Sequence, residues 1–234
     1  MTMEETELDR PNWATLTSRH AAIAQGDHLA RRFPAEISML AGIPRIDGDS
    51  MAALAEMVAV TGPVGVAQVG HVPCPDGTHD IHAFDVNQMI LRVTGIGLAD
   101  DRLVRLGAHN AAAMLALATM TKPGPFALRT HELGEYWGLF ENGELIAMAG
   151  ERMKLPGYTE ISGVCTRPDQ CGKGLARRLC RHLVARIQAR GETPFLHVET
   201  TKPEVEAFYA RLGFETRQML NVHVFAPESP AQPH

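Results

Sequence analysis

The sequence predicts an α/β (α+β) protein with a smaller N-terminal α/β domain, and three observations support this fold class. Strand-like and helix-like segments alternate from about residue 101 onward. The tetrapeptide Glu141-Asn142-Gly143-Glu144 separates two strand-like runs, and an Asn-Gly pair in that position predicts a β-hairpin. Residues 174–190 carry apolar side chains at helical spacing, which predicts one long amphipathic helix.

Length and composition limit the classes of protein to which the chain can belong. At about 150 residues per domain, 234 residues suffice for about one and a half domains. A content of 45% hydrophobic and 21% charged residues excludes a mostly disordered chain. No apolar run approaches the ~18–20 residues of a membrane helix, and the acidic N-terminus is unlike a signal peptide. We therefore expect a cytoplasmic protein that does not associate with membranes.

The cysteines do not indicate a disulfide framework or a metal centre. Their spacing fits neither, so we expect reduced thiols and no metal site. The four cysteines are Cys74, Cys165, Cys171 and Cys180.

The first hundred residues are predicted to form a small α/β domain. Apolar spacing predicts a helix from Trp13 to Phe33, which Pro34 ends. A second helix is expected from Met51 to Val60, with Ser50 as its N-cap and Gly62 as its end. A strand over residues 64–69, a loop over 70–80 and a strand-like segment over 81–93 follow. We place the domain boundary at residues 98–101.

The second domain is predicted to span residues 101–226, followed by a flexible tail at 227–234. Gly191 and Gly213 are expected to end the helices at 174–190 and 203–212, because glycine favours the left-handed conformation after a helix. Strands are expected at 102–106, 136–140, 145–152, 159–166, 195–199 and 215–225, and helices at 109–119, 174–190 and 203–212.

Charge is distributed unevenly between the two domains. Residues 1–100 carry 6 basic and 13 acidic side chains, whereas residues 101–234 carry 16 and 14. Basic residues are concentrated at 167–190, either as the solvated face of a helix or as a contact for a small anion. The overall acidity argues against a nucleic-acid platform.

A glycine-containing turn between a predicted strand and the long helix has the features of an anion-binding site. Free amides at a helix N-terminus and the helix dipole attract phosphate, and Gly172 and Gly174 allow it close to the backbone. The turn is not a Walker loop, because no Gly-Lys-Ser/Thr follows. It also lacks the third glycine of a dinucleotide fingerprint.

Three stretches together resemble the GNAT family of N-acetyltransferases, in the branch with an FR47-like C-terminal domain. Cys171-Gly172-Lys173-Gly174-Leu175-Ala176 is similar to the family's pyrophosphate motif, Arg/Gln-x-x-Gly-x-Gly/Ala. Residues 207–214 resemble the family's Tyr-x-x-x-Gly-Phe helix, and residues 160–166 resemble the strand along acetyl-CoA. The resemblance covers roughly the last 125 residues and implies a mixed central sheet flanked by helices.

The resemblance implies that acetyl-CoA is a cosubstrate and that no metal is needed. It implies a general acid at Tyr209 and a general base at Glu160. His197 and Glu199, on the following strand, are weaker candidates for the base. Two positions depart from the family pattern: Cys171 replaces Arg or Gln, and Lys202 replaces an Asn. The cofactor-binding residues it implies are Val164, Cys165, Thr166, Gln170, Cys171, Gly172, Lys173, Gly174, Leu175, Ala176, Arg177 and Lys202.

The implied function is acetyl transfer to a primary amine by direct attack in a ternary complex. The acceptor is a small molecule or a peptide, and a homodimer is compatible with the sequence. Two alternatives remain open, a non-catalytic acyl-CoA-binding or regulatory module and a nucleotide-binding domain of another kind. Residues 1–100 are expected to shape the acceptor pocket, either as a separate small domain or as a degenerate half of the same fold.

Overall fold

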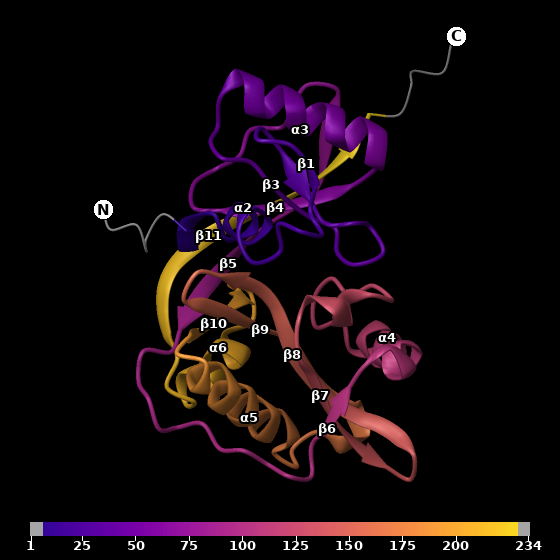
Figure 1. Ribbon diagram of the computed structural model, residues 1–234, viewed down its shortest axis with the longest axis vertical. Helices are drawn as coiled ribbons and strands as arrows, with labels where there is room; N and C mark the ends of the chain where they lie inside the picture. The colour runs from indigo at the N-terminus through magenta and orange to yellow at the C-terminus, as the bar shows by residue number, and fades with distance from the viewer. Residues whose placement is uncertain (1–6, 229–234) are drawn as a thin grey trace. The chain divides into compact units, whose positions relative to one another are not determined.

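The computed structural model describes residues 7–228, which form two compact units (Figure 1). Unit 1 consists of residues 7–35, 39–86 and 219–228, and unit 2 of residues 36–38 and 87–218. These units divide the chain differently from the domains expected at 1–100 and 101–226. The two expected domains stay a prediction about which parts of the chain fold independently. In the predicted tail, Pro227 ends a strand, and residues 229–234 lie outside the described part.

Unit 1 packs two helices, α2 and α3, against a small sheet, whose pairing order is β1-β2-β3-β4-β11-β5. The pairs β1–β2, β2–β3 and β4–β11 are antiparallel, and β3 and β4 are parallel. Apolar side chains of α3, including Leu54 and Val58, pack against Val64, Val66 and Phe225 of the strands. The elements are α2 Pro11–Thr17, β1 Gln25–Gly26, β2 Arg31–Arg32, β3 Leu40–Gly42, α3 Gly48–Thr61, β4 Val64–Gln68, and parts of β5 Thr78–Ile90 and β11 Glu215–Pro227.

The helix predicted over Trp13–Phe33 is wrong beyond Thr17, because the chain turns into the β1-β2 hairpin instead. Gly26 adopts φ +104°, and a Cβ there would lie 2.2 Å from the Ala30 carbonyl oxygen. Asp27 accepts hydrogen bonds from the amides of Leu29 and Ala30, which fixes the turn. The turn at Gly26 and Asp27 therefore determines the structure of this segment, although its apolar residues have helical spacing.

The second helix, α3, confirms the predicted helix at 51–60 but begins earlier. Its N-cap is Asp47, whose side chain accepts from the Ser50 amide, so the predicted Ser50 cap is wrong. Gly62, at φ +80°, ends the helix as predicted. The strands predicted at 64–69 and 81–93 correspond to β4 and β5.

Unit 2 contains a mixed sheet in the order β11-β5-β10-β9-β8-β7-β6. Strands β6 to β9 are antiparallel neighbours, and β9 is parallel to β10. Every strand and helix predicted here is present with shifted ends, so the mixed α/β architecture is confirmed. The elements are β6 Val104–Leu106, α4 Ala111–Thr121, β7 Tyr136–Glu141, β8 Glu144–Leu155, β9 Tyr158–Thr166, α5 Leu175–Ala189, β10 Thr193–Glu199 and α6 Pro203–Ala210, with short 3-10 turns at Ala108–Asn110, Thr130–Leu133 and Pro168–Gln170.

Two apolar clusters cover the two faces of the unit 2 sheet. One joins α5 and α6 to the strands through residues such as Leu179, Leu183 and Val198. The other lies beneath α4 and includes Met114 and Tyr136. Figure 1 shows α5 and α6 on one side of β8 and α4 on the other.

The predicted hairpin joins β7 to β8. Asn142 and Gly143 have φ values of +52° and +83°, and Glu141 pairs with Glu144. This geometry is the two-residue turn that an Asn-Gly pair favours. No helix within residues 7–228 has the length and apolar character needed to cross a membrane.

Candidate active site

The parallel strands β9 and β10 are paired only at their amino ends. The register joins Tyr158 to Thr193, Thr159 to Pro194 and Glu160 to Phe195. Within the described chain, residues 161–166 of β9 and 196–199 of β10 are not paired with each other; we call this part of the two strands the unpaired stretch. Backbone amides and carbonyls there can hydrogen-bond an extended ligand, as an added strand would.

The glycine turn follows β9 directly and leads into α5. Gly172 and Gly174 have φ values of +80° and +76°, and a Cβ added at either would meet no atom within 4 Å. The Arg178 amide makes the first hydrogen bond of α5, to the Gly174 carbonyl oxygen at 3.1 Å, so the helix amides from Leu175 to Arg177 have no acceptor within the helix. The turn thus presents free amides and open space at the helix N-terminus, as its sequence predicts for an anion site.

Most arginines of the 167–190 cluster already contact carboxylates or carbonyls. Arg167 pairs with Glu144 and Asp169, and Arg178 pairs with Asp100. Arg186 pairs with Glu135, and Arg190 pairs with both Glu151 and Glu192. Arg181 donates to the Ile96 carbonyl. Lys173 and Arg177 are exposed near the turn. The charges facing a phosphate there are therefore fewer than the sequence count indicates.

Gln170 and Lys173 are held together beside the turn. Lys173 Nζ donates to Gln170 Oε1 at 2.6 Å, and Gln170 Nε2 donates to Glu141 Oε2 at 2.8 Å. Cys171, in contrast, is exposed. Gln170, one position before the motif's first residue, is therefore a buried link between the turn and β7.

The predicted cofactor residues of β9 face in different directions. Val164 packs against the α5 cluster, whereas Cys165 belongs to the cluster beneath α4, where burial raises its pKa to about 11. The Thr166 hydroxyl is buried without a hydrogen-bond partner in the described chain. Lys202 Nζ pairs with Glu199 Oε1 at 2.8 Å.

Tyr209 on α6 is a buried aromatic residue of the α5 cluster. Its ring packs edge-on against Phe208 and Phe214, with centroids 5.0 and 5.9 Å apart. Burial raises the pKa of Tyr209 well above 10, and the Cys180 and Glu160 groups add to the shift. The phenol is therefore protonated at neutral pH, the state that a proton donor requires.

Glu160 lies in a buried ion pair. Arg152 Nε and Nη2 donate to its two carboxylate oxygens at 2.8 and 2.6 Å, and the Met153 amide donates at 3.3 Å. Burial favours the protonated acid, but Arg152 and then His197 outweigh it, and they lower the pKa of Glu160 to about 2. The carboxylate is thus ionised and already holds several donors.

Sequence reasoning missed Arg152, Gln88 and Arg217, and it ranked His197 low. His197 Nδ1 lies 2.8 Å from Glu160 Oε1. Its Nε2 lies 3.1 Å from Gln88 Nε2. The alternation of apolar and polar residues along 195–199 indicates that His197 and Glu199 share a face, but not which strand supplies their partners.

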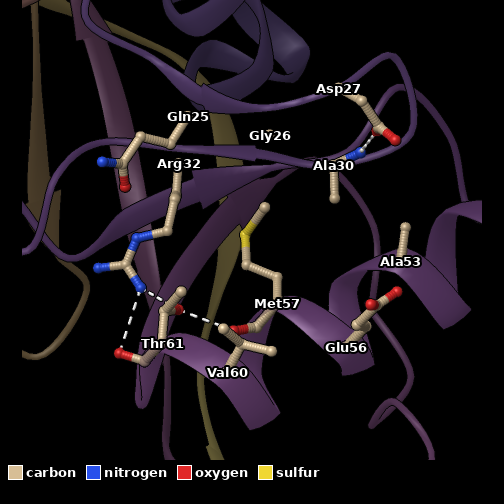
Figure 2. Close-up of a pocket in the computed structure, with 10 residues that line it drawn as sticks. All are labelled: Gln25, Gly26, Asp27, Ala30, Arg32, Ala53, Glu56, Met57, Val60 and Thr61. Carbon is tan, nitrogen blue, oxygen red and sulfur yellow. Dashed lines mark hydrogen bonds between the residues drawn. The ribbon is translucent and has the colours of Figure 1, made fainter.

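Unit 1 contains a pocket of about 310 Å³ between the β1-β2 hairpin and α3 (Figure 2). Arg32 crosses one side and donates to the carbonyl and hydroxyl of Thr61. Met57 points into the pocket, while Asp27 bonds its own loop (Figure 2). None of the predicted site residues lines this pocket. Within residues 7–228, no group of three or more His, Cys, Asp or Glu side chains could hold a metal ion.

Comparison with known proteins identifies the family. No curated protein matches the sequence. The profile of the FR47-like protein family matches residues 136–223. A crystal structure from Novosphingobium aromaticivorans, described as GNAT-family, is 32% identical, covers 95% of this chain and 99% of its own, and has a TM-score of 0.88.

A GCN5-related N-acetyltransferase from Kribbella flavida has the same fold at 13% identity. It covers 94% of this chain and 95% of its own, with a TM-score of 0.59. At 32% identity over nearly the whole length, the first relative shows more than a shared fold. The chain therefore belongs to the GNAT family of acetyltransferases.

Proposed function

We propose that the protein transfers an acetyl group from acetyl-CoA to a primary amine by direct attack in a ternary complex. The observation that carries this proposal is the sequence of three features in unit 2. Along the chain, the open glycine turn lies between the β9 and β10 parts of the unpaired stretch, and the buried Tyr209 follows β10. Family membership supports acetyl transfer as the reaction class.

The residues around the turn fit a pyrophosphate and its pantetheine arm. Free amides at the N-terminus of α5 and the open space at Gly172 and Gly174 suit phosphate oxygens. The buried Thr166 hydroxyl at the end of β9 has no partner in the described chain, so a polar ligand would satisfy it. Lys173 and Arg177 would supply charge, and the backbone from Val164 to Thr166 would bind the arm's amides.

Acetyl-CoA supplies an activated acyl group, and the protein's residues orient it and move protons. Tyr209 would donate its proton to the thiolate as the carbon–sulfur bond breaks. Glu160, predicted as the general base, is already bound to Arg152 and His197, so in our proposal it acts through His197. The Lys202 contact with the cofactor is retained in the proposal, since its ion pair with Glu199 is half-exposed.

A thiol-release assay tests this function. The full chain would be incubated with acetyl-CoA and, separately, with amino acids, polyamines, aminoglycosides and lysine-containing peptides, with mass spectrometry of the acceptor. We expect CoA release that depends on one amine class. CoA binding by calorimetry without thiol release for any amine would instead favour a non-catalytic acyl-CoA-binding module. Preferential binding of ATP or NAD would favour the nucleotide-binding alternative.

Tyr209→Phe tests the assigned proton donor. We expect kcat to fall about 100-fold while the KM for acetyl-CoA changes little, because the hydroxyl acts on the departing sulfur. Tyr136→Phe is a matched control, since it also removes a buried hydroxyl, one with no hydrogen-bond partner in the described chain. Equal kcat values for the two variants would contradict the role of Tyr209.

A further inference from the structure

A row of polar side chains crosses five neighbouring strands of unit 2. From β8 to β11 it contains Arg152, Glu160, His197, Gln88 and Arg217, one residue from each strand in the sheet order β8-β9-β10-β5-β11. Beyond the contacts already given, Arg217 Nε donates to Gln88 Oε1 at 2.6 Å. Each member is therefore hydrogen-bonded to the next one across the sheet.

The two arginines fix the direction of every hydrogen bond in this row. Arginine donates only, so Gln88 Oε1 must accept from Arg217, and Gln88 Nε2 then donates toward His197. At the other end, Glu160 accepts from Arg152 and from His197 Nδ1. These directions place the ring proton of His197 on Nδ1 and direct the lone pair of Nε2 at an N–H donor.

His197 and Tyr209 lie on opposite sides of β10. Leu196 and Val198 belong to the same apolar cluster as Tyr209. Because successive side chains of a strand alternate between faces, His197 points to the other face. It also lies in the unpaired stretch, two positions after Phe195, the last β10 residue paired with β9.

We propose that His197 is the proton acceptor for the amine substrate and that Glu160 and Arg152 are positioning residues that hold its ring. This inference rests on the proposed acetyl transfer and deepens it. An amine N–H can replace the Gln88 N–H as the donor to Nε2. The base then stands on one face of β10 and the proton donor Tyr209 on the other, on either side of the reacting thioester.

The proposed step is balanced in protons and bonds. Nε2 of His197 takes one proton from the ammonium, and the freed lone pair forms the bond from nitrogen to the thioester carbonyl carbon. The amine loses its second proton to solvent as the carbon–sulfur bond breaks, with its electron pair going to sulfur. Tyr209 protonates the thiolate and recovers a proton from the His197 imidazolium through solvent. Glu160 stabilises that imidazolium by charge and hydrogen bond.

Several groups around His197 affect its protonation. Glu160 on β9 is the charged group in direct contact, and Gln88 on β5 is an uncharged donor. The Phe195 ring on its own strand lies edge-on with centroids 5.6 Å apart. Arg152 on β8 and Arg217 on β11 are each one hydrogen bond further away.

Nuclear magnetic resonance tests the tautomer without any acceptor. In a long-range ¹H–¹⁵N spectrum of the full chain labelled with [¹⁵N]histidine, the His197 signals are those absent from His197→Gln. We expect the Nδ1–H tautomer at pH 7.5. An Nε2–H tautomer, or a ring protonated on both nitrogens at that pH, would overturn the inference.

His197→Gln tests the base directly, using the most active amine of the thiol-release screen. We expect kcat to fall about 100-fold with the KM for acetyl-CoA within about twofold of the wild-type value. Glu160→Gln should give a fall of about tenfold, because the base remains but is less well held. His223→Gln is the matched control: His223 is also buried and its Nδ1 contacts Asp80 Oδ2 at 2.5 Å.

Gln88→Glu separates catalysis from folding. The carboxylate has the size of the amide and can still accept from Arg217, so we expect the fold to persist by circular dichroism. It would also accept a hydrogen bond from the protonated Nε2–H of His197, which stabilises the imidazolium. The acid limb of the pH–rate profile should then move to higher pH; an unchanged profile would contradict the proposal.

Failure of this inference is distinguishable from failure of the proposed function. If wild-type protein releases CoA but His197→Gln is as active as His223→Gln, only the role of His197 is overturned. If wild-type protein releases no CoA with any amine, acetyl transfer and the base assignment are both overturned, whatever the tautomer.

Discussion

Each unit contains a buried histidine hydrogen-bonded through Nδ1 to a carboxylate, and the two pairs differ in their surroundings. In unit 2, the Glu160 side chain is 1% exposed and is also bound by Arg152. In unit 1, Asp80, the partner of His223, is 26% exposed. His223 also stacks on Phe225 and meets the edge of His71, at centroid distances of 5.6 and 5.0 Å.

A histidine–carboxylate pair by itself therefore does not identify a catalytic site. Arg152 donates to the carboxylate of the His197–Glu160 pair, and Gln88 connects His197 to Arg217 on the other side. The pair also lies where the parallel strands β9 and β10 stop pairing with each other. Aromatic packing surrounds the His223 pair, and its carboxylate reaches solvent. The surroundings therefore separate a candidate proton acceptor from a structural contact.

Arg152→Gln should have the largest effect on stability, because it leaves the Glu160 carboxylate buried without its cation. We expect a loss of about 3–5 kcal/mol in the free energy of unfolding. Urea denaturation at pH 7 would measure it. The double variant Arg152→Gln/Glu160→Gln should recover much of the loss, because no charge then stays unpaired. If the double variant is no more stable than the single one, the lost energy comes from packing of the arginine rather than from the ion pair.

The acid dependence of stability should reflect Glu160. Its pKa in the folded protein is lowered to about 2 from an ordinary 4.5. A lowered pKa contributes stability that is fully present above about pH 4.5 and is lost as the pH falls toward 2. The loss over this whole range should be on the order of 3 kcal/mol.

Urea denaturation of wild type and Glu160→Gln between pH 6 and pH 3 measures this dependence. The variant should begin less stable and lose less stability as the pH falls, so the two curves converge. Parallel curves would mean that the carboxylate of Glu160 is not held as an ion in the folded state.

The fold of unit 2 could be predicted from the sequence because its signals are local. The Asn142-Gly143 turn, the spacing of apolar residues in α5 and the glycines after two helices each specify their own segment. The segment 18–33 was mispredicted because Gly26 and Asp27 form a turn inside a helix-like pattern. A local backbone preference there outweighed the period of the apolar side chains.

The site was predictable only in part, because its polar row depends on strand register. The family resemblance singles out Glu160, but it does not reveal the residues that bind Glu160. Arg152 lies 8 positions from Glu160 in the sequence, and His197 lies 37 positions from it. Gln88 and Arg217 are 129 positions apart. Nothing in the sequence states which strands become neighbours, so a candidate base could be named without its partners.

Asp80→Asn should have the smallest effect on stability, and it tests the His223–Asp80 pair of unit 1 against the His197–Glu160 pair of unit 2. The amide oxygen of asparagine can still accept from His223, and the side chain is partly solvated. We expect a loss of at most about 1 kcal/mol in the free energy of unfolding. Acetyl transfer should continue at the wild-type rate, since His223 lies outside the proposed row. A loss of stability as large as that of Arg152→Gln would show that the His223–Asp80 and Glu160–Arg152 contacts stabilise the fold equally. The surroundings of the two histidine–carboxylate pairs would then no longer distinguish them. A loss of activity with stability intact would give the His223 pair a part in the reaction.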